Sequence, residues 1–335
     1  MPAVPSDRLA AVHDALISWY RRVGRDLPWR RTRDPYKILV SEIMLQQTQV
    51  DRVIPKYHQF LQAFPTLEAL GESPVAEVIR VWAGLGYNRR AVRLHAIARQ
   101  AAEQFDGVLP ASADALRELD GLGAYTSNAV ACFSGEAQVG VVDTNVRRVL
   151  GRVFADEIGL EPTAGPALQA FAESVLPAGR AYEWNQALMD LGASVCTARA
   201  PDHNACPLAL HCAGRSLVST ATPARRAAES VAEYTLALPE MPAAPSRPAP
   251  SRPAKAKAVQ PFEQTTRYFR GRIVDACRTL EAGASLGLDE LGTRLRADYD
   301  ADRHRDWVAG LVEGLRRDGL VAVDAASGEA RVTLP

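Results

Sequence analysis

The side chain best placed to do acid–base chemistry is the carboxyl group of Glu42. It lies in the stretch 40–50, where apolar residues recur at helical spacing and the acid interrupts their face. A carboxyl group buried in such a helix must be paired, hydrogen-bonded or protonated. Taken alone, Glu42 is explained equally well by a structural role in the first turn of a helix, behind Ser41, and by a catalytic role.

A second carboxylate, Asp143, stands where a loop enters a helix, so an N-cap is its simplest role. Upstream of it, residues 119–126 read Leu-Asp-Gly-Leu-Gly-Ala-Tyr-Thr, with Gly121 and Gly123 directly before a helical run. Backbone N–H groups at such a turn can hold a phosphate oxygen. An ordinary helix–helix turn is the alternative.

Three of the five cysteines crowd into residues 196–212, which read Cys196-x6-His203-x2-Cys206-x5-Cys212. The chain shows no secretion signal, and without one such crowding favours a metal or iron–sulfur site over disulfides. Three thiolates and an imidazole are competent ligands for such a site.

The composition is that of a soluble globular protein, with 335 residues of which 47% are hydrophobic and 23% charged. No apolar run reaches membrane-spanning length, so we expect a cytoplasmic location and no membrane partner. The formal net charge is zero, and no whole-molecule field indicates nucleic acid. Arginines cluster at 21–33 and 89–99, a pattern that solvated helix faces also show.

Helical spacing is nearly continuous over 1–218, which predicts an all-α domain containing the cysteine loop 196–212. Residues 219–261 are rich in Pro, Ala and Ser and predict a linker. Residues 262–335 predict a small α+β module resembling a winged helix. Its expected elements are helices at 267–280, 286–295 and 304–318 and strands at 320–323 and 330–334, with a turn at Ser327-Gly328.

Further motifs lie between residues 27 and 212. They read Leu27-Pro28-Trp29-Arg30, Pro35-Tyr36, Ser41-Glu42-Ile43-Met44-Leu45-Gln46-Gln47-Thr48-Gln49-Val50, Trp82-x-Gly84-Leu85-Gly86-Tyr87, Asn185-Gln186-Ala187-Leu188-Met189-Asp190-Leu191-Gly192 and Cys206-Pro207-Leu208. In this order they resemble the helix-hairpin-helix DNA glycosylases related to endonuclease III, most closely the MutY-type adenine glycosylases. The resemblance implies a mainly α, two-lobed glycosylase domain with a 4Fe–4S cluster loop. It also implies a nucleoid-associated base-excision-repair enzyme that acts, as a monomer by default, on duplex DNA with adenine opposite 8-oxoguanine or guanine.

The resemblance gives four residues catalytic roles. Glu42 looks like the general acid that protonates the adenine, and Asp143 like the carboxylate that stabilises the oxocarbenium-like sugar. For this the two pKa values must be pushed apart, so that Glu42 keeps its proton while Asp143 stays ionised. Asn145 is similar to the residue that orients the attacking water. Tyr125 occupies the position of a lysine in bifunctional relatives, which implies a monofunctional enzyme.

The same resemblance suggests a DNA-contacting set. Gln47 and Tyr87 look like wedges that enter the base stack when the target base is flipped out, with Thr48 and Leu85 near the opposite base. A place in the core is the simpler explanation of Leu85 and Tyr87, more so for Leu85. Phosphate contacts are expected from the hairpin and from the arginine clusters, through Gly121, Gly123, Thr126 and Arg30.

Four departures from the family pattern stand out. His203 replaces the second cysteine of the cluster motif, and we expect a Cys₃His-ligated 4Fe–4S cluster. Asp120 and Asn88 replace a proline and a tyrosine that are usual there. Residues 262–335 have too few strands for the family's Nudix-like domain. Helix 304–318, which carries several arginines, is then a candidate to enter a DNA groove. The alternative is that this module is a structural appendage.

Two rival functions stay open at this point. A mismatch thymine or uracil glycosylase shares the scaffold, the aspartate and often the hairpin without lysine. A non-catalytic DNA-binding iron–sulfur protein would explain the hairpin, the cysteines and the C-terminal module. It would not require Glu42, Asp143 and Asn145 together.

Overall fold

The computed structural model describes residues 3–135, 137–216, 261–281, 283–325 and 329–335. They form two compact units, each built from two segments of the chain. The first unit takes in Met1–Gln47 and the described part of Val108–Pro239, and the second Thr48–Gly107 and the described part of Glu240–Pro335. The linker expected at 219–261 lies almost wholly outside the described residues. The domain limits drawn from the sequence therefore stay predictions.

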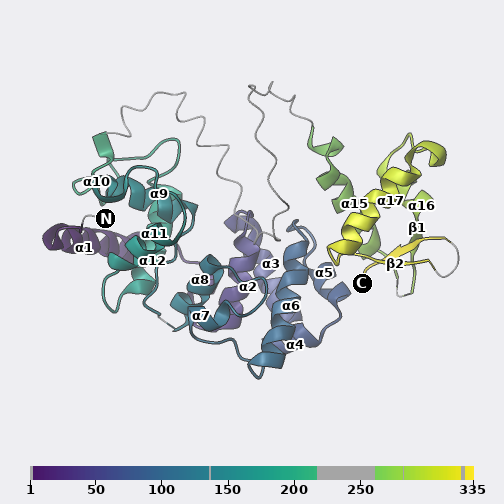
Figure 1. The fold of residues 1–335 in the computed structure, drawn as a ribbon, viewed down its shortest axis with the longest axis horizontal. Coiled ribbons are helices and arrows are strands. Elements are labelled where there is room, and N and C mark those ends of the chain that lie inside the picture. Colours follow the sequence, from purple (N-terminus) through teal and green to yellow (C-terminus); the bar gives the residue numbers. More distant parts are fainter. Residues whose placement is uncertain (1–2, 136, 217–260, 282, 326–328) are drawn as a thin grey trace. The chain divides into compact units, whose positions relative to one another are not determined.

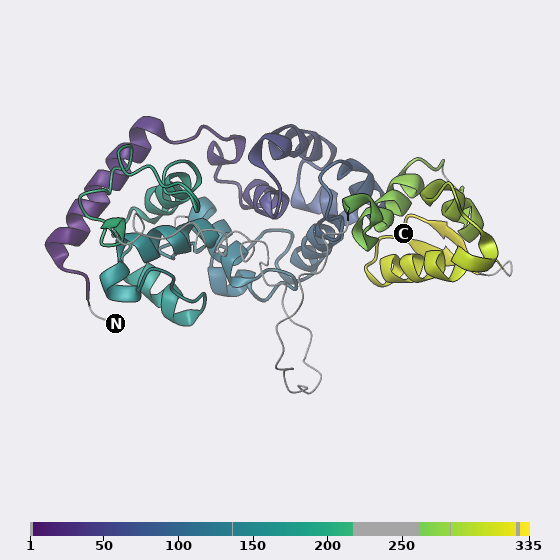
Figure 2. The same ribbon diagram turned by 90° about the horizontal axis from the view of Figure 1, so that it is seen from above.

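The regular structure described in the first unit is entirely helical (Figure 1). Helix α12 contacts both α1 and α9, and the core between them buries Leu16, Val149 and Trp184. Figure 2 shows α1, in purple, alongside teal helices of this core. The all-helical expectation is confirmed here. The elements are α1 (Ser6–Val23), η1 (Pro28–Arg30), α2 (Pro35–Leu45), α7 (Ala113–Leu116), α8 (Ala124–Gly135), α9 (Thr144–Val153), α10 (Ala155–Ile158), α11 (Pro166–Ser174) and α12 (Ala181–Ser194).

Helix α2 is an interior helix. It begins where the Asp34 carboxylate accepts the backbone N–H of Tyr36 at 2.9 Å and Pro35 takes the first helical position. Every residue from 38 to 44 is buried, so the helix is enclosed on all sides and packs against α8. A polar side chain between residues 38 and 44 is therefore held away from bulk water.

The second unit contains four helices from residues 48–107 and the C-terminal module. The helices are α3 (Val50–Ala63), α4 (Leu67–Glu72), α5 (Val75–Val81) and α6 (Arg89–Gln104). The module, drawn in green to yellow in Figures 1 and 2, contains η2 (Phe262–Gln264), α15 (Thr266–Arg278), β1 (Leu286–Gly287), α16 (Leu288–Leu295), α17 (Ala301–Arg317), β2 (Ala322–Asp324) and β3 (Arg331–Thr333).

The three strands of the module form an antiparallel sheet in the order β1-β3-β2. Val332 of β3 pairs with Leu286 on one side and Val323 on the other. The expected three helices and two strands are confirmed and are consistent with a winged-helix module. Strand β1 was not predicted, and the expectation that Leu286 and Gly287 begin a helix is wrong. Two residues are too few to show an alternating pattern. The turn expected at Ser327-Gly328 lies outside the described residues.

The described helices include none that is both long and apolar enough to cross a lipid bilayer.

Candidate active site

Glu42 lies in the last turn of α2, close to the C-terminus of the helix. The structural explanation offered by the sequence, a carboxylate in the first turn behind Ser41, is therefore wrong. Asp34 caps this helix, and the Ser41 hydroxyl donates a hydrogen bond to the Ile38 carbonyl at 2.7 Å. Glu42 is only 6% exposed. A helix cap does not explain this buried acid.

The surroundings of Glu42 favour its protonated form. Burial, the largest cause, raises the pKa of Glu42 to about 7, and the nearby charge of Asp143 raises it further. A hydrogen bond with the Tyr125 side chain and the positive charge of Arg30 act in the opposite direction. Tyr125 lies in the first turn of α8, the helix against which α2 packs. Glu42 is thus poised to give up a proton near neutral pH.

Asp143 caps the N-terminus of α9, as its position in the sequence suggested. Its carboxylate accepts the backbone N–H of Val146 at 2.6 Å and the side-chain amide of Asn145 at 3.0 Å. Burial, the largest cause, raises the pKa of Asp143 above its ordinary value, and these two donors and the charge of Arg148 offset only part of that increase. Asp143 has more donors directed at its charged form than Glu42 has, so of the two carboxyl groups Asp143 is better placed to carry a negative charge and Glu42 to keep a proton.

Arg148 connects Asp143, through Asn145, to the cysteine loop. Its guanidinium donates to the Asn145 side-chain oxygen at 2.7 Å, the Gly192 carbonyl at 2.8 Å and the Cys196 carbonyl at 3.0 Å. Asn145 in turn donates to Asp143. Sequence reasoning missed Arg148; its place three residues after Asn145, on the same face of a helix, was the available signal.

Two residues of the 185–192 motif, Gly192 and Asn185, pack against or hydrogen-bond to the chain on either side of Asp143. A Cβ atom on Gly192 would lie 2.8 Å from the Cβ of Asn145, so only glycine permits the close approach. The Asn185 side chain accepts the backbone N–H of Val141 at 2.9 Å and donates to the Val139 carbonyl at 3.0 Å. The segment that leads into Asp143 is thereby fixed.

The arginines at 21–33 are largely occupied by protein partners. The Arg30 side chain is 8% exposed and donates two hydrogen bonds, each of 2.8 Å, to the Asp190 carboxylate, which Arg25 also binds. The pKa of Asp190 lies below its ordinary value. Burial acts to raise this pKa, but the hydrogen bonds and the positive charge of Arg30 lower it by more, with help from Arg25. The expected phosphate contact of Arg30 is therefore wrong for this conformation. Its guanidinium acts inside the protein.

The hairpin has the backbone geometry expected of a tight turn before α8. Gly121 has a φ of 96°, a value that favours glycine, and Gly123 is exposed with open space around it. Asp120 is exposed beside them. Thr126 is only 5% exposed, so its side chain is withdrawn from the surface and a phosphate contact at this position stays a prediction for its backbone. The backbone of the two glycines remains the candidate phosphate contact.

Both expected wedge residues have strained backbones. Gln47 has a φ of 55° and Tyr87 a φ of 45°, and each side chain is exposed. Non-glycine residues rarely adopt positive φ, and such outliers concentrate at functional sites. Leu85 differs: its side chain is 3% exposed, so the structure supports the core role and not direct contact with the opposite base.

Arg90 organises the segment 85–87. Its guanidinium donates to the Thr48 hydroxyl at 3.0 Å and to the carbonyls of Leu85 and Gly86 at 3.3 and 3.1 Å. Its carbon Cζ lies 5.4 Å from the centre of the Tyr87 ring. Burial lowers the pKa of Arg90 to about 10. The sequence placed this arginine in a cluster expected to face phosphates, whereas the structure places it in the interior.

Helix α17 lacks the basic face expected of a helix that enters a DNA groove. Arg305 pairs with Asp289, and Arg316 and Arg317 both pair with Glu313. Acidic residues also outnumber arginines over 262–335. The electrostatic attraction that drives such docking is therefore weak for this module.

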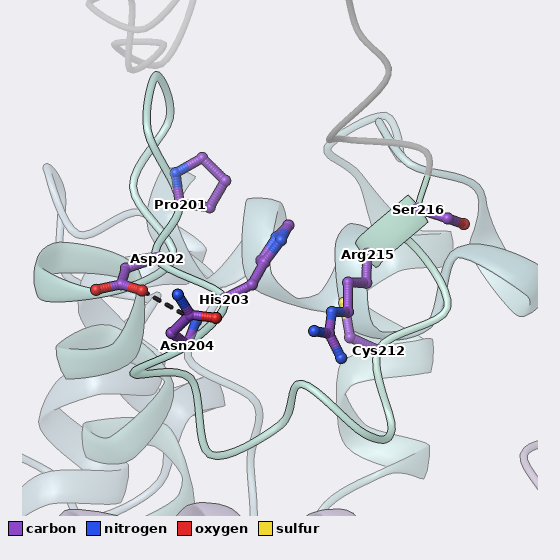
Figure 3. Close-up of a pocket in the computed structure, with 7 residues that line it drawn as sticks. All are labelled: Pro201, Asp202, His203, Asn204, Cys212, Arg215 and Ser216. Atoms are coloured by element: carbon purple, nitrogen blue, oxygen red, sulfur yellow. Dashed lines mark hydrogen bonds between the residues drawn. The ribbon is translucent and has the colours of Figure 1, made fainter.

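The cysteine loop supplies the ligand types that the sequence indicated. Cys196, His203, Cys206 and Cys212 line one small pocket, and burial together with the two neighbouring thiols raises the pKa of Cys212 to about 11. Figure 3 shows the open side of this loop, with 201–204 facing 212–216. Within the described residues no three His, Cys, Asp or Glu side chains are already arranged to hold a metal. The donor types and the pocket fit a cluster, but their arrangement is not preformed.

Over its helical part the chain is similar to known proteins. Residues 40–173 match the family model described as HhH-GPD superfamily base excision DNA repair protein. The adenine DNA glycosylase of Mycolicibacterium smegmatis is 48% identical over 202 residues, which span 60% of this chain and 68% of that protein. The human adenine DNA glycosylase is 41% identical over 222 residues, spanning 63% of this chain and 40% of that protein. A solved structure of a thermostable thymine-DNA glycosylase has a TM-score of 0.59 at 29% identity and covers 63% of this chain and 98% of its own.

Proposed function

The chain belongs to the adenine DNA glycosylase family, within the HhH-GPD superfamily of base excision DNA repair proteins. On that premise we propose that it excises adenine mispaired with 8-oxoguanine or guanine in duplex DNA. The observation that carries the proposal is the pair of buried carboxyl groups. Burial raises the pKa of Glu42 to about 7, and the nearby Asp143 carboxylate, whose pKa burial also raises, accepts two hydrogen bonds that favour its charged form. Two carboxyl groups with separated roles are what cleavage of a glycosidic bond requires.

The proposed reaction breaks the bond between the adenine nitrogen and the sugar carbon C1′. Glu42 gives its proton to a ring nitrogen of the flipped adenine, so the bonding electrons leave with a neutral base. Asp143 stabilises the positive charge that develops on the sugar. A water molecule, oriented by Asn145, then adds to C1′, and the proton that it loses returns to Glu42 and restores the acid. Tyr125 offers no amine, so no Schiff base forms and the product is an abasic site.

The partner that we propose is duplex DNA bearing the mispair, contacted by Gln47, Thr48 and Tyr87 and by the backbone of the hairpin glycines. The strained backbones of the two exposed wedge candidates support this assignment. A nucleoid location rests on the same proposal.

We also propose that Cys196, His203, Cys206 and Cys212 hold a 4Fe–4S cluster. The three thiols and the imidazole around one pocket support this, and the cluster would stabilise the loop that Arg148 joins to Asn145.

A comparison of substrates tests the proposed function. Purified protein is incubated with duplexes carrying A opposite 8-oxoguanine, A opposite G, and T or U opposite G, and base release is measured. Adenine release from the first two supports the proposal. Release of T or U alone would contradict the proposal and show that the protein is a mismatch thymine or uracil glycosylase. The 29% identical solved structure is that of a thymine-DNA glycosylase. Tight DNA binding with no base release would favour a non-catalytic protein.

Base release is expected to slow as the pH rises through about 7. Glu42 carries its proton below that pKa and loses it above, so the general acid is depleted in alkaline solution. The single-turnover rate of adenine release, followed from about pH 5 to 9, checks this. DNA affinity measured over the same range is the control. A rate that stays constant above pH 7 would contradict the role of Glu42.

Replacing His203 by Ala is expected to lower the iron content, whereas His203→Cys preserves it by restoring a fourth thiolate. Iron and sulfide analysis of protein purified without oxygen checks this against about four of each per chain. His211→Ala is the matched control, since this neighbouring histidine is outside the proposed ligand set. A colourless, iron-free and fully active wild-type protein would refute the cluster.

A further inference from the structure

The C-terminal module contacts the segment that contains Tyr87. From helix α15, Arg267 donates a hydrogen bond to the Tyr87 hydroxyl at 2.9 Å, and its carbon Cζ lies 4.6 Å from the centre of the tyrosine ring. From the last turn of the same helix, Arg278 donates to the Ile79 carbonyl at 3.0 Å and to the Asn88 side-chain oxygen at 2.9 Å. Two arginines of one helix thus bind two adjacent residues.

An apolar core holds α15 in this position. Ile79 of α5 is fully buried in the same cluster as Ile273 and Val274 of α15, and Val92 of α6 packs against the cluster. Arg89 pairs with Asp318 at 3.5 Å beside them. The contact between Arg267 and Tyr87 is therefore supported by a packed interface.

Tyr87 depends on such support. Its φ of 45° is a conformation that bulky side chains seldom adopt, and its side chain is exposed. Arg90 and Arg267 both approach the ring, at 5.4 and 4.6 Å from its centre. A cation near an aromatic face is attracted to it, so the two guanidinium groups restrict the orientation of the ring.

We propose that Arg267 is a positioning residue that holds Tyr87 in the orientation required to enter the base stack. The inference rests on the proposed function, because it assigns a role to a residue expected to act as a wedge. It makes the C-terminal module part of the base-flipping machinery without requiring a DNA-binding surface on α17. It also explains Asn88, which departs from the family pattern and accepts a hydrogen bond from Arg278.

The first test measures the single-turnover rate and the DNA affinity of Arg267→Ala. The rate of adenine release is expected to fall about five- to tenfold, because one exposed cation–π contact and one hydrogen bond are lost. The affinity for DNA should stay near that of wild type. Arg267→Lys should recover much of the rate, since an ammonium group keeps the charge over the ring. Arg272→Ala, an exposed arginine on the same helix, is the control and should leave the rate unchanged.

A double-mutant cycle separates this role from direct contact with DNA. If Arg267 acts through Tyr87, Arg267→Ala has no further effect in a Tyr87→Ala background. Additive losses, or a wild-type rate in Arg267→Ala, would overturn the inference while leaving the proposed function in place. An inactive wild-type protein would instead refute the proposed function.

NMR of protein with isotope-labelled tyrosine, recorded without DNA, tests the contact between Arg267 and Tyr87 independently of activity. The Tyr87 signal, assigned with Tyr87→Phe, should shift in Arg267→Ala and not in Arg272→Ala. An unmoved signal would contradict the contact.

Discussion

Glu42→Gln is expected to slow adenine release by about 10²- to 10⁴-fold, the usual contribution of a positioned general acid. The amide has nearly the shape of the carboxyl group but has no acidic proton to give to the base. The measurement is the single-turnover rate with A opposite 8-oxoguanine, together with the DNA dissociation constant, which should stay close to that of wild type. A near-normal rate would remove Glu42 from the mechanism.

The same substitution should stabilise the fold in alkaline solution. The folded-state pKa of Glu42, about 7, is above its ordinary value of 4.5, so the folded protein binds this proton more tightly than the unfolded chain. Stability from this group is fully present below the ordinary value and is lost as the pH rises through about 7. Glu42→Gln should therefore raise the melting temperature more at pH 8 than at pH 5. Glu173→Gln, an exposed acid in α11, is the matched control for both measurements.

Asp143→Asn is expected to lower the rate by about 10²- to 10³-fold or more, as for loss of one electrostatic stabiliser of a charged transition state. Asparagine caps helices as well as aspartate does, so α9 should keep its N-terminus and the protein its melting temperature. Asp143→Ala adds a second effect, because it removes the cap and costs about 1 kcal/mol of folding free energy.

The comparison of the two variants isolates the charge. If Asn and Ala reduce the rate equally while only Ala lowers the melting temperature, the charge of Asp143 accounts for the catalytic loss. Wild-type activity in Asp143→Asn would show that the carboxylate serves only as a cap.

The centre of the candidate site could be predicted from the sequence because each member lies in a contiguous motif. Glu42 is in an apolar helix, Tyr125 follows the hairpin glycines, and Asp143 precedes a helix. Their grouping in the structure follows from helices that the apolar periodicity also indicated. Thr126, next to Tyr125, shows the limit of this reasoning, since a motif does not say which side of a helix is buried.

The arginines could not be predicted in this way. Arg30 and Arg90 look in sequence like members of solvated or DNA-facing clusters, and their partners lie far along the chain. Arg30 meets Asp190, and Arg90 meets Thr48. Only tertiary packing decides whether such a guanidinium group faces solvent or satisfies carbonyl and carboxylate groups inside the protein.

The burial of Ile79 against the C-terminal module affects how deletion experiments should be read. Fully burying such a side chain contributes about 1.5–3 kcal/mol, and a chain shortened before residue 261 would expose it to water. Lost activity in that truncated protein would report damage to helices α5 and α6 as readily as loss of a DNA-reading module. Point substitutions in α15 leave this interface in place, and they are the cleaner way to separate the two parts.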